Sequence, residues 1–218
     1  MESCTYQPPQ DPLEIVYIDE ALIAVNKPSG LLSVPGRGDE RQDCLIHRIQ
    51  TDFPDALIVH RLDMSTSGLL LLARGAAMQS RLSWLFMNRQ VNKRYEAVVD
   101  GLLENESGEI DLPLICDWPN RPKQKVDFES GKSSLTKYCL LSRDKAALLS
   151  RVVLEPVTGR SHQLRVHLAS IGHPILGDAL YAGTAATRAE RLLLHASNLS
   201  LPHPLTAEPL SLHCPTPF

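Results

Sequence analysis

The sequence predicts an α+β fold in a single domain, and two observations lead to this prediction. Short segments rich in β-branched and apolar residues, which are typical of strands, are interspersed with only a few segments of helical spacing, and the two kinds do not alternate regularly. No linker-like stretch divides the 218 residues, and a chain of this length can bury a sizeable core.

The N-terminal part begins with predicted strands. Glu14–Val25 carries β-branched and apolar residues around an Asp-Glu turn, which predicts a hairpin or two short strands. Asn26–Gly30 is a turn-forming cluster that ends the second strand, and Leu31–Asp39, with two glycines and a proline, predicts an irregular loop. Cys44–Gln50 is predicted to form a short helix.

Two continuous apolar runs, Ala56–Val59 and Leu69–Ala73, follow this part of the chain. Short apolar runs bounded by turn residues are typical of buried strands, although periodicity alone does not distinguish them from a buried helix. Ala76–Asn88 predicts a helix, because its apolar residues recur at helical spacing: Met78, Leu82, Leu85 and Phe86.

The C-terminal half contains three further predicted strands, at Arg94–Asp100, Leu135–Leu141 and Ser150–Glu155. A helix is predicted to begin near Ser161. Gly172 stands where the glycine of a helix C-terminus is expected.

Composition is typical of a globular protein of a reducing compartment. Hydrophobic residues make up 43% and charged residues 22% of the chain. No run approaches the roughly 20 apolar residues of a membrane-spanning helix, and the first ten residues lack the features of a signal peptide. The five cysteines are odd in number, far apart and without a Cys-x-x-Cys pair. We therefore expect a cytoplasmic protein.

The net charge of −3 is a mild argument against nucleic-acid binding. Binding needs only one basic face, however, and Arg121, Lys123 and Lys125 lie within five residues with no acid among them. Arg160 and Arg165 form another basic pair. Each of these groups, taken alone, is more consistent with an ordinary solvated surface.

The polar segment His60–Gly68 (HRLDMSTSG) separates the two apolar runs. A loop that emerges from two buried elements holds its side chains on a rigid base, where catalytic groups are often placed. If the segment is extended, Arg61 and Asp63 project from the same face. The alternative is that Asp63 and its hydroxyl neighbours only cap turns.

Gly159–Asp178 (GRSHQLRVHLASIGHPILGD) is a second dense polar cluster. A helix from about Ser161 would place Ser161, Arg165 and Leu168 on one face. An arginine on such an element is a natural partner for a buried aspartate, because its guanidinium binds both carboxylate oxygens and lowers the pKa of the acid. The alternatives are a solvent-facing basic helix or a core histidine that the backbone satisfies.

Metal binding is the rival use of the histidines in this cluster. His162 and His167 are five apart, which is not the His-x3-His spacing that places two ligands on one helical face, and no His-Glu-x-x-His motif occurs. We therefore expect no metal site.

Four segments together resemble the motif series of the RluA family of pseudouridine synthases. They are VNKPSGLLSVP (Val25–Pro35), HRLDMSTSGLLLLAR (His60–Arg74), KRYEAVV (Lys93–Val99) and GRSHQLRVHLASIGHPILGD (Gly159–Asp178). They occur in the family's order and are spread over residues 25–178, which is most of the chain. A fifth stretch, Asp111–Val126, resembles a bacterial member that modifies both 23S ribosomal RNA and transfer RNA.

The resemblance implies one catalytic domain at 13–218, after an extended segment at 1–12. Its fold would be a large mixed, mostly antiparallel sheet flanked by helices and loops. Larger relatives carry an N-terminal S4-type RNA-binding domain, and none is expected here because the motifs begin at Val25. The implied partner is RNA, with target uridines in stem-loops of 23S ribosomal RNA and transfer RNA. No membrane and no obligate protein partner are expected, and a monomer is the default.

The resemblance also implies roles for individual residues. Asp63 would be the catalytic carboxylate, and Arg165 would pair with it. Tyr95 would contact the target base, Arg61 would fill the space that the flipped uridine leaves, and Leu194 would belong to the apolar wall of the pocket. The residues expected to contact RNA are Arg61, Arg121, Lys123, Lys125, Arg160, His162 and Gln163.

The implied reaction suits these residue types. The N-glycosidic bond of uridine breaks, the uracil turns, and C5 bonds to C1′; no redox change occurs and no group is lost, so we expect no cofactor. Asp63 could attack C1′ or C6, or remove a 2′ proton, and these alternatives stay open. Two rival functions also stay open, a non-catalytic RNA-binding module and a metal-dependent hydrolase.

Overall fold

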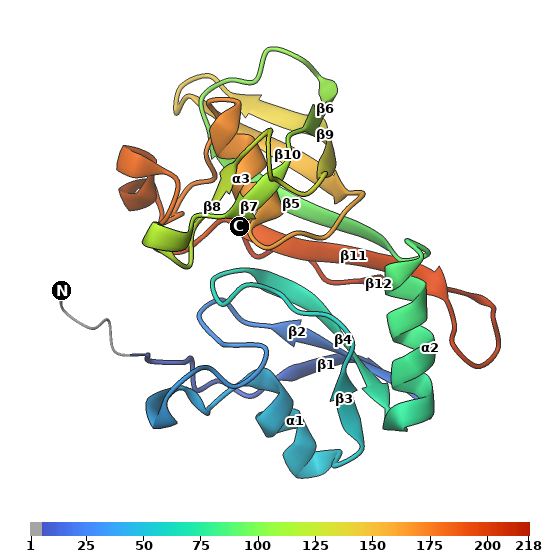
Figure 1. The fold of residues 1–218 in the computed structure, drawn as a ribbon. Helices are drawn as coiled ribbons and strands as arrows, with labels where there is room; N and C mark the ends of the chain where they lie inside the picture. The colour runs from blue at the N-terminus through green and yellow to red at the C-terminus, as the bar shows by residue number, and fades with distance from the viewer. Residues whose placement is uncertain (1–5) are drawn as a thin grey trace. The chain divides into compact units, whose positions relative to one another are not determined.

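The computed structural model describes residues 6–218, and these residues form two compact units (Figure 1). Unit 1 contains residues 6–92 and 196–216, and unit 2 contains residues 93–195 and 217–218. Twelve strands and three α-helices lie in the described part of the chain, which confirms the α+β class. No helix within residues 6–218 is long and apolar enough to cross a membrane. Residues 1–5 of the predicted N-terminal segment lie outside the described residues.

Unit 1 is built on a sheet in which β1, β2, β4 and β11 are neighbours in that order, with β3 beside β4 and β12 beside β11. The strands β1 and β2 form the predicted antiparallel hairpin. The elements are β1 (Glu14–Ile18), β2 (Leu22–Lys27), α1 (Leu45–Asp52), β3 (Ala56–Ile58), β4 (Ser67–Arg74), α2 (Gly75–Met87), β11 (Leu194–Pro202, of which residues from 196 on belong to this unit) and β12 (Pro209–His213).

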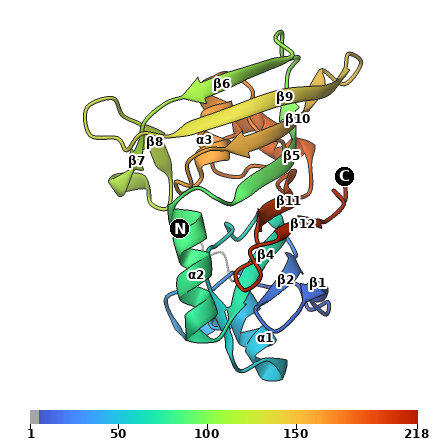
Figure 2. The ribbon, with the colours of Figure 1, turned by 90° about the vertical axis from the view of Figure 1, so that its right-hand side faces the viewer.

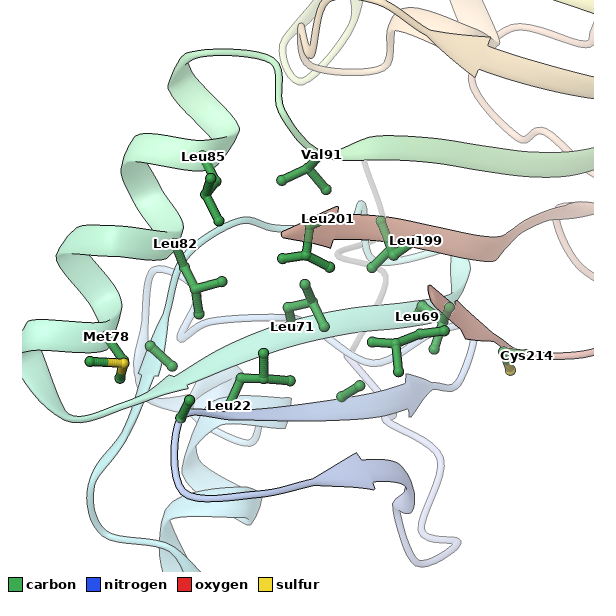
Figure 3. Close-up of a cluster of buried hydrophobic side chains, with 14 residues drawn as sticks. Leu22, Leu69, Leu71, Met78, Leu82, Leu85, Val91, Leu199, Leu201 and Cys214 are labelled. Atoms are coloured by element: carbon green, nitrogen blue, oxygen red, sulfur yellow. The ribbon is translucent and has the colours of Figure 1, made fainter. Parts of the chain in front are cut away.

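The core of unit 1 lies between this sheet and α2, as Figure 3 shows. Met78, Leu82 and Leu85 of α2 point towards the strands and pack in one cluster with Leu22 of β2 and Leu71 of β4. The apolar run predicted as a buried strand is β4, and seven of its eight residues are buried. Both faces of this strand are therefore covered. The loop that precedes β4 thus ends at a rigidly held element.

Unit 2 contains an antiparallel sheet in the order β5, β10, β9, β6, with α3 on one face (Figure 2). A separate pair of short strands, β7 and β8, forms a hairpin. The elements are β5 (Asn92–Asp100), β6 (Ser107–Asp111), β7 (Leu114–Cys116), β8 (Gln124–Val126), β9 (Leu135–Asp144), β10 (Leu149–Pro156) and α3 (Gln163–Ser170). Three of these strands were predicted; β6, β7 and β8 were not identified from the sequence.

Helix α3 begins at Gln163, two residues later than predicted, because His162 has a φ of 54° in the left-handed region. Ser161 therefore precedes the helix, and the shared face predicted for it with Arg165 and Leu168 is wrong. The predicted end is confirmed. Gly172 has a φ of 84°, its N–H donates to the carbonyl of Ala169, and the next N–H donates to the carbonyl of Leu168, which is a Schellman motif.

Buried polar side chains anchor α3 to β9. The amide of Gln163 accepts from the hydroxyl of Thr158 at 2.8 Å and donates to the hydroxyl of Thr136 at 3.0 Å. His167 bonds to Thr136 through Nδ1 and to the carbonyl of Leu112 through Nε2, both at 3.0 Å. Since a carbonyl can only accept, Nε2 carries a proton and Nδ1 of the neutral ring accepts from Thr136. The interpretation of a core histidine satisfied by the protein is confirmed for His167.

This network predicts a loss of stability in mild acid. Burial lowers the pKa of His167 below the 6.5 of a free histidine, so the unfolded chain binds more protons as the pH falls below about 6.5. The contribution of His167 is therefore fully present above that pH and decreases below it. We expect the unfolding free energy to fall less between pH 7 and pH 5 in His167→Asn than in the wild type, in denaturant titrations.

The solvent-exposed His213 supplies the matched control for this experiment. His213→Asn should keep the pH dependence of the wild type. An identical pH dependence in His167→Asn and the wild type would contradict the proposed contribution of the buried ring.

Candidate active site

The loop between β3 and β4 carries Asp63 in an irregular segment, as the sequence predicted. Arg61 is exposed and Asp63 is half-buried, while Leu62 between them is only 8% exposed. The backbone carbonyl of Asp63 accepts from the N–H of Thr66 at 3.1 Å and closes a turn. Leu62 thus fixes the loop to the interior while its two charged neighbours remain accessible.

Lys27, at the end of β2, binds the backbone of this loop. Its side chain is fully buried, and Nζ donates to the carbonyls of Pro28 at 2.8 Å, Leu31 at 2.7 Å and Met64 at 3.0 Å. An ammonium group has three protons, and three carbonyls replace the water that it loses on burial. Because Met64 directly follows Asp63, this cation fixes the backbone beside the predicted catalytic carboxylate.

The turn after β2 holds the same loop at three further points. The hydroxyl of Ser29 donates to the carbonyl of Ser65 at 2.7 Å, and the hydroxyl of Ser33 donates to the carbonyl of Leu62 at 2.8 Å. The N–H of Gly30, whose φ is 89°, donates to the carbonyl of Met64 at 2.8 Å.

The sequence indicated only a turn at Asn26–Gly30, so the role of this turn in supporting the Asp63 loop was missed. The available signal was a lysine at the end of an apolar strand, which suggests a buried charge that needs partners.

His60 fixes the other end of the loop. Its Nε2 accepts from the backbone N–H of Leu71 in β4 at 2.9 Å, so the neutral ring carries its proton on Nδ1. The ring stacks on Phe86 of α2, with centroids 4.5 Å apart. The loop is therefore held at both ends by elements of the core of unit 1.

In unit 2, Arg165 of α3 forms a buried ion pair with Asp178. Nε donates to Oδ2 and Nη2 donates to Oδ1, both at 2.7 Å, and the two side chains are 5% and 0% exposed. Oδ1 of Asp178 also accepts from the N–H of Leu180 at 2.9 Å. This pair fixes the plane of the guanidinium. Sequence reasoning missed Asp178 because it attributed the arginine to Asp63; pairing of Arg165 with Asp63 stays a prediction.

Tyr95 and Leu194 belong to the apolar core of unit 2. Tyr95 lies on β5 opposite Leu154 of β10 and is half-buried. Leu194 is 3% exposed and lies in the cluster against which Tyr95 packs. These two residues have the apolar surroundings that a base-binding wall requires, and their contact with a base stays a prediction.

The predicted basic residues occupy the β7–β8 hairpin of unit 2. Arg121 is exposed, and its guanidinium carbon lies 4.1 Å from the ring centroid of Trp118, a contact within cation–π range. Lys123 is half-buried, and Lys125 is exposed and forms an ion pair with Asp127 at 3.5 Å. Trp118 is 68% exposed and was not identified from the sequence.

The remaining predicted RNA contacts lie around the start of α3. Arg160 is exposed, and its Nε donates to the carbonyl of Ser133 at 3.2 Å. Nδ1 of His162 lies 2.6 Å from the hydroxyl of Tyr181. Gln163 is 4% exposed, and its amide is committed to the network under α3. That network gives Gln163 a structural role, while contact with RNA stays a prediction.

The candidate residues are divided between the two units. Asp63 and Arg61 lie in unit 1, and the other predicted residues lie in unit 2, which contains Tyr95, Arg121, Lys123, Lys125, Arg160, His162, Gln163, Arg165 and Leu194.

Comparison with known proteins agrees with the motif series. A family model described as RNA pseudouridylate synthase matches residues 21–170. A Vibrio cholerae protein named dual-specificity RNA pseudouridine synthase RluA is 51% identical over 100% of this chain and 89% of its own length. An Escherichia coli K12 protein of the same name is 51% identical over 98% of both chains. The chain belongs to the RluA family of RNA pseudouridine synthases. These enzymes are isomerases, and the family resemblance predicted from the motifs is confirmed.

Solved structures confirm the pseudouridine synthase fold of this RluA-family chain. Human RNA pseudouridylate synthase domain containing 1 has a TM-score of 0.80 and 31% identity, over 97% of this chain and 87% of the human chain. Human RNA pseudouridylate synthase domain containing 4 has a TM-score of 0.74 and 27% identity, over 93% and 88%. The predicted fold class, a mostly antiparallel sheet with a few helices, is therefore correct.

The geometry around Lys27 predicts a large effect of its removal. Lys27→Met keeps a side chain of similar length but takes the buried donors away from three carbonyls. We expect a loss of about 3 kcal/mol or more in unfolding free energy, since each unsatisfied buried group costs roughly 1–3 kcal/mol. Amide hydrogen exchange at residues 60–66 should accelerate. The exposed Lys145 provides the control, since Lys145→Met should change neither quantity; equal stability of Lys27→Met and wild type would disprove the anchoring role.

Proposed function

We propose that this enzyme converts specific uridines of 23S ribosomal RNA and transfer RNA to pseudouridine in the cytoplasm. The observation that carries the proposal is about 51% identity, over nearly the whole chain, to proteins named dual-specificity RNA pseudouridine synthase RluA. We further propose that residues 13–218 act as one catalytic domain, and as a monomer. Target uridines lie in stem-loops, where unpaired bases are accessible to protein side chains.

Asp63 is the catalytic carboxylate in this proposal. Its half-buried position on a loop anchored by Lys27, Ser33 and His60 supports the role, because a reacting group needs a fixed position and access to substrate. Most glycosidases need two carboxylates, one to protonate the leaving group and one to stabilise or attack the sugar. In the proposed isomerisation the detached uracil is itself the acceptor, so one ionised aspartate beside a cation suffices.

Arg165 and Tyr95 support the reaction from unit 2. We assign to Arg165 the cation that pairs with Asp63, and its bidentate bond to Asp178 supports this by fixing the guanidinium. Tyr95 would contact the target base and Leu194 would line the apolar wall. A dry pocket is required so that water does not capture the sugar intermediate.

Access to the target uridine requires that the nucleotide leave the RNA stack, at a cost of about a few kcal/mol. Arg61, exposed beside Asp63, would fill the vacated space. Arg121, Lys123, Lys125, Arg160, His162 and Gln163 would contact the RNA, with the basic residues binding phosphates and positioning the strand. The reaction needs no cofactor, because no electrons are transferred and no group is lost.

A tritium-release assay tests the function and separates it from both rivals. Unmodified bacterial ribosomal and transfer RNA, labelled with tritium at uridine C5, should release tritium when incubated with the wild type, with or without EDTA. Asp63→Asn should reduce release by several orders of magnitude while RNA binding persists. Absence of release by the wild type would disprove the isomerase, release that EDTA abolishes would contradict a reaction without a cofactor, and full release by Asp63→Asn would disprove the assignment of Asp63.

Lys123 provides a test of the phosphate contacts. Lys123→Ala should weaken RNA binding and reduce the slope of the logarithm of affinity against the logarithm of salt concentration by about one, because one fewer phosphate is neutralised. The measurement is filter binding of transfer RNA over a range of salt concentrations. Lys145→Ala, at an exposed site of the same unit, should leave the slope unchanged. An unchanged slope in Lys123→Ala would exclude this residue from the interface.

A further inference from the structure

Tyr181 lies at the centre of a side-chain cluster in unit 2 that sequence analysis did not identify. The residue is half-buried and lies three positions after Asp178, in the segment between α3 and β11. Its backbone N–H donates to Oδ1 of Asp178 at 3.3 Å, so the tyrosine belongs to the same turn as the partner of Arg165.

The hydroxyl of Tyr181 joins the β7–β8 hairpin to the start of α3. It accepts from the backbone N–H of Gln124, the first residue of β8, at 2.8 Å. It also lies 2.6 Å from Nδ1 of His162, the residue that precedes α3. Gln124 directly follows Lys123, so the hydroxyl fixes the hairpin backbone beside a residue assigned to RNA binding.

The ring of Tyr181 has a second contact, on Arg165. The guanidinium carbon lies 5.2 Å from the ring centroid, within the range of a cation–π interaction. The ring also meets the imidazole of His162 edge-on, with centroids 5.6 Å apart and planes at 80°. Arg165 is therefore held by Asp178 in the plane of its nitrogens and contacted by Tyr181 through an aromatic ring.

We propose that Tyr181 is a positioning residue that couples the RNA-binding hairpin to Arg165. Its hydroxyl sets the position of the hairpin and His162, and its ring supports the guanidinium. An RNA strand bound to the hairpin is thereby positioned relative to Arg165, because Tyr181 contacts both the hairpin and the guanidinium. This inference rests on the proposed function, since it assigns RNA to the hairpin and a catalytic-site cation to Arg165.

Two substitutions separate the contributions of the hydroxyl and the ring. Tyr181→Phe removes the hydrogen bonds to Gln124 and His162 and keeps the ring beside Arg165. It should raise KM for a tritium-labelled, unmodified transfer RNA about three- to tenfold, the effect of one or two lost hydrogen bonds, and lower kcat less than twofold. Tyr181→Leu also removes the ring, so it should raise KM similarly and lower kcat at least about threefold. Arg165→Ala should lower kcat and thus serves as the reference for loss of the cation.

Tyr138→Phe is the matched control, because it removes a tyrosine hydroxyl from the same unit at a strand position outside this cluster. Its kinetics should equal those of the wild type. A role limited to stability would lower the melting temperature of Tyr181→Phe and leave KM unchanged, and that result would overturn the proposal. Equal kcat in Tyr181→Leu and Tyr181→Phe would overturn the role of the ring. Absence of tritium release by the wild type would instead reject the proposed function.

Discussion

The ammonium group of Lys27, buried at the end of β2 and bound by three backbone carbonyls, is the constraint on which the Asp63 loop depends. A cation without water is stable in a protein interior only when oxygen atoms surround it. Here those atoms come from both segments that must be joined, the turn at Pro28 and Leu31 and the loop at Met64. The lysine therefore links two irregular segments that have no strand pairing to fix them.

The hydroxyls of Ser29 and Ser33 and the N–H of Gly30 add directional bonds to the same loop. Each of these bonds ends on a carbonyl of residues 62 to 65, so the loop is fixed through its backbone atoms. A loop that was fixed through its side chains would lose them for chemistry. Backbone anchoring thus reconciles rigidity with accessibility in this segment.

In unit 2 a cation is fixed by a different means, through its own side chain. A buried arginine and aspartate are costly to desolvate, and such a pair is tolerated when its geometry is bidentate and its remaining lone pairs are satisfied. Arg165 and Asp178 meet both conditions, because Asp178 also accepts from the N–H groups of Leu180 and Tyr181. The result is a guanidinium whose orientation is set before any substrate arrives, which is what electrostatic stabilisation of a reacting group requires.

The sequence predicted those parts of the structure that depend on local pattern. Continuous apolar residues predicted β4, helical spacing predicted α2, and Gly172 predicted the end of α3. The predicted beginning of α3 was wrong because His162 adopts the left-handed conformation. A glycine would have indicated this conformation in the sequence, and a histidine does not. The carbonyl partners of Lys27 and the pairing of Arg165 with Asp178 could not be predicted, since contacts made by irregular segments leave no periodicity in the sequence. Motif order predicted Asp63 as the catalytic carboxylate, and only the structure showed what holds its loop.

In the proposed isomerisation the base never leaves as a product, so the enzyme must restrain a detached uracil with its own side chains.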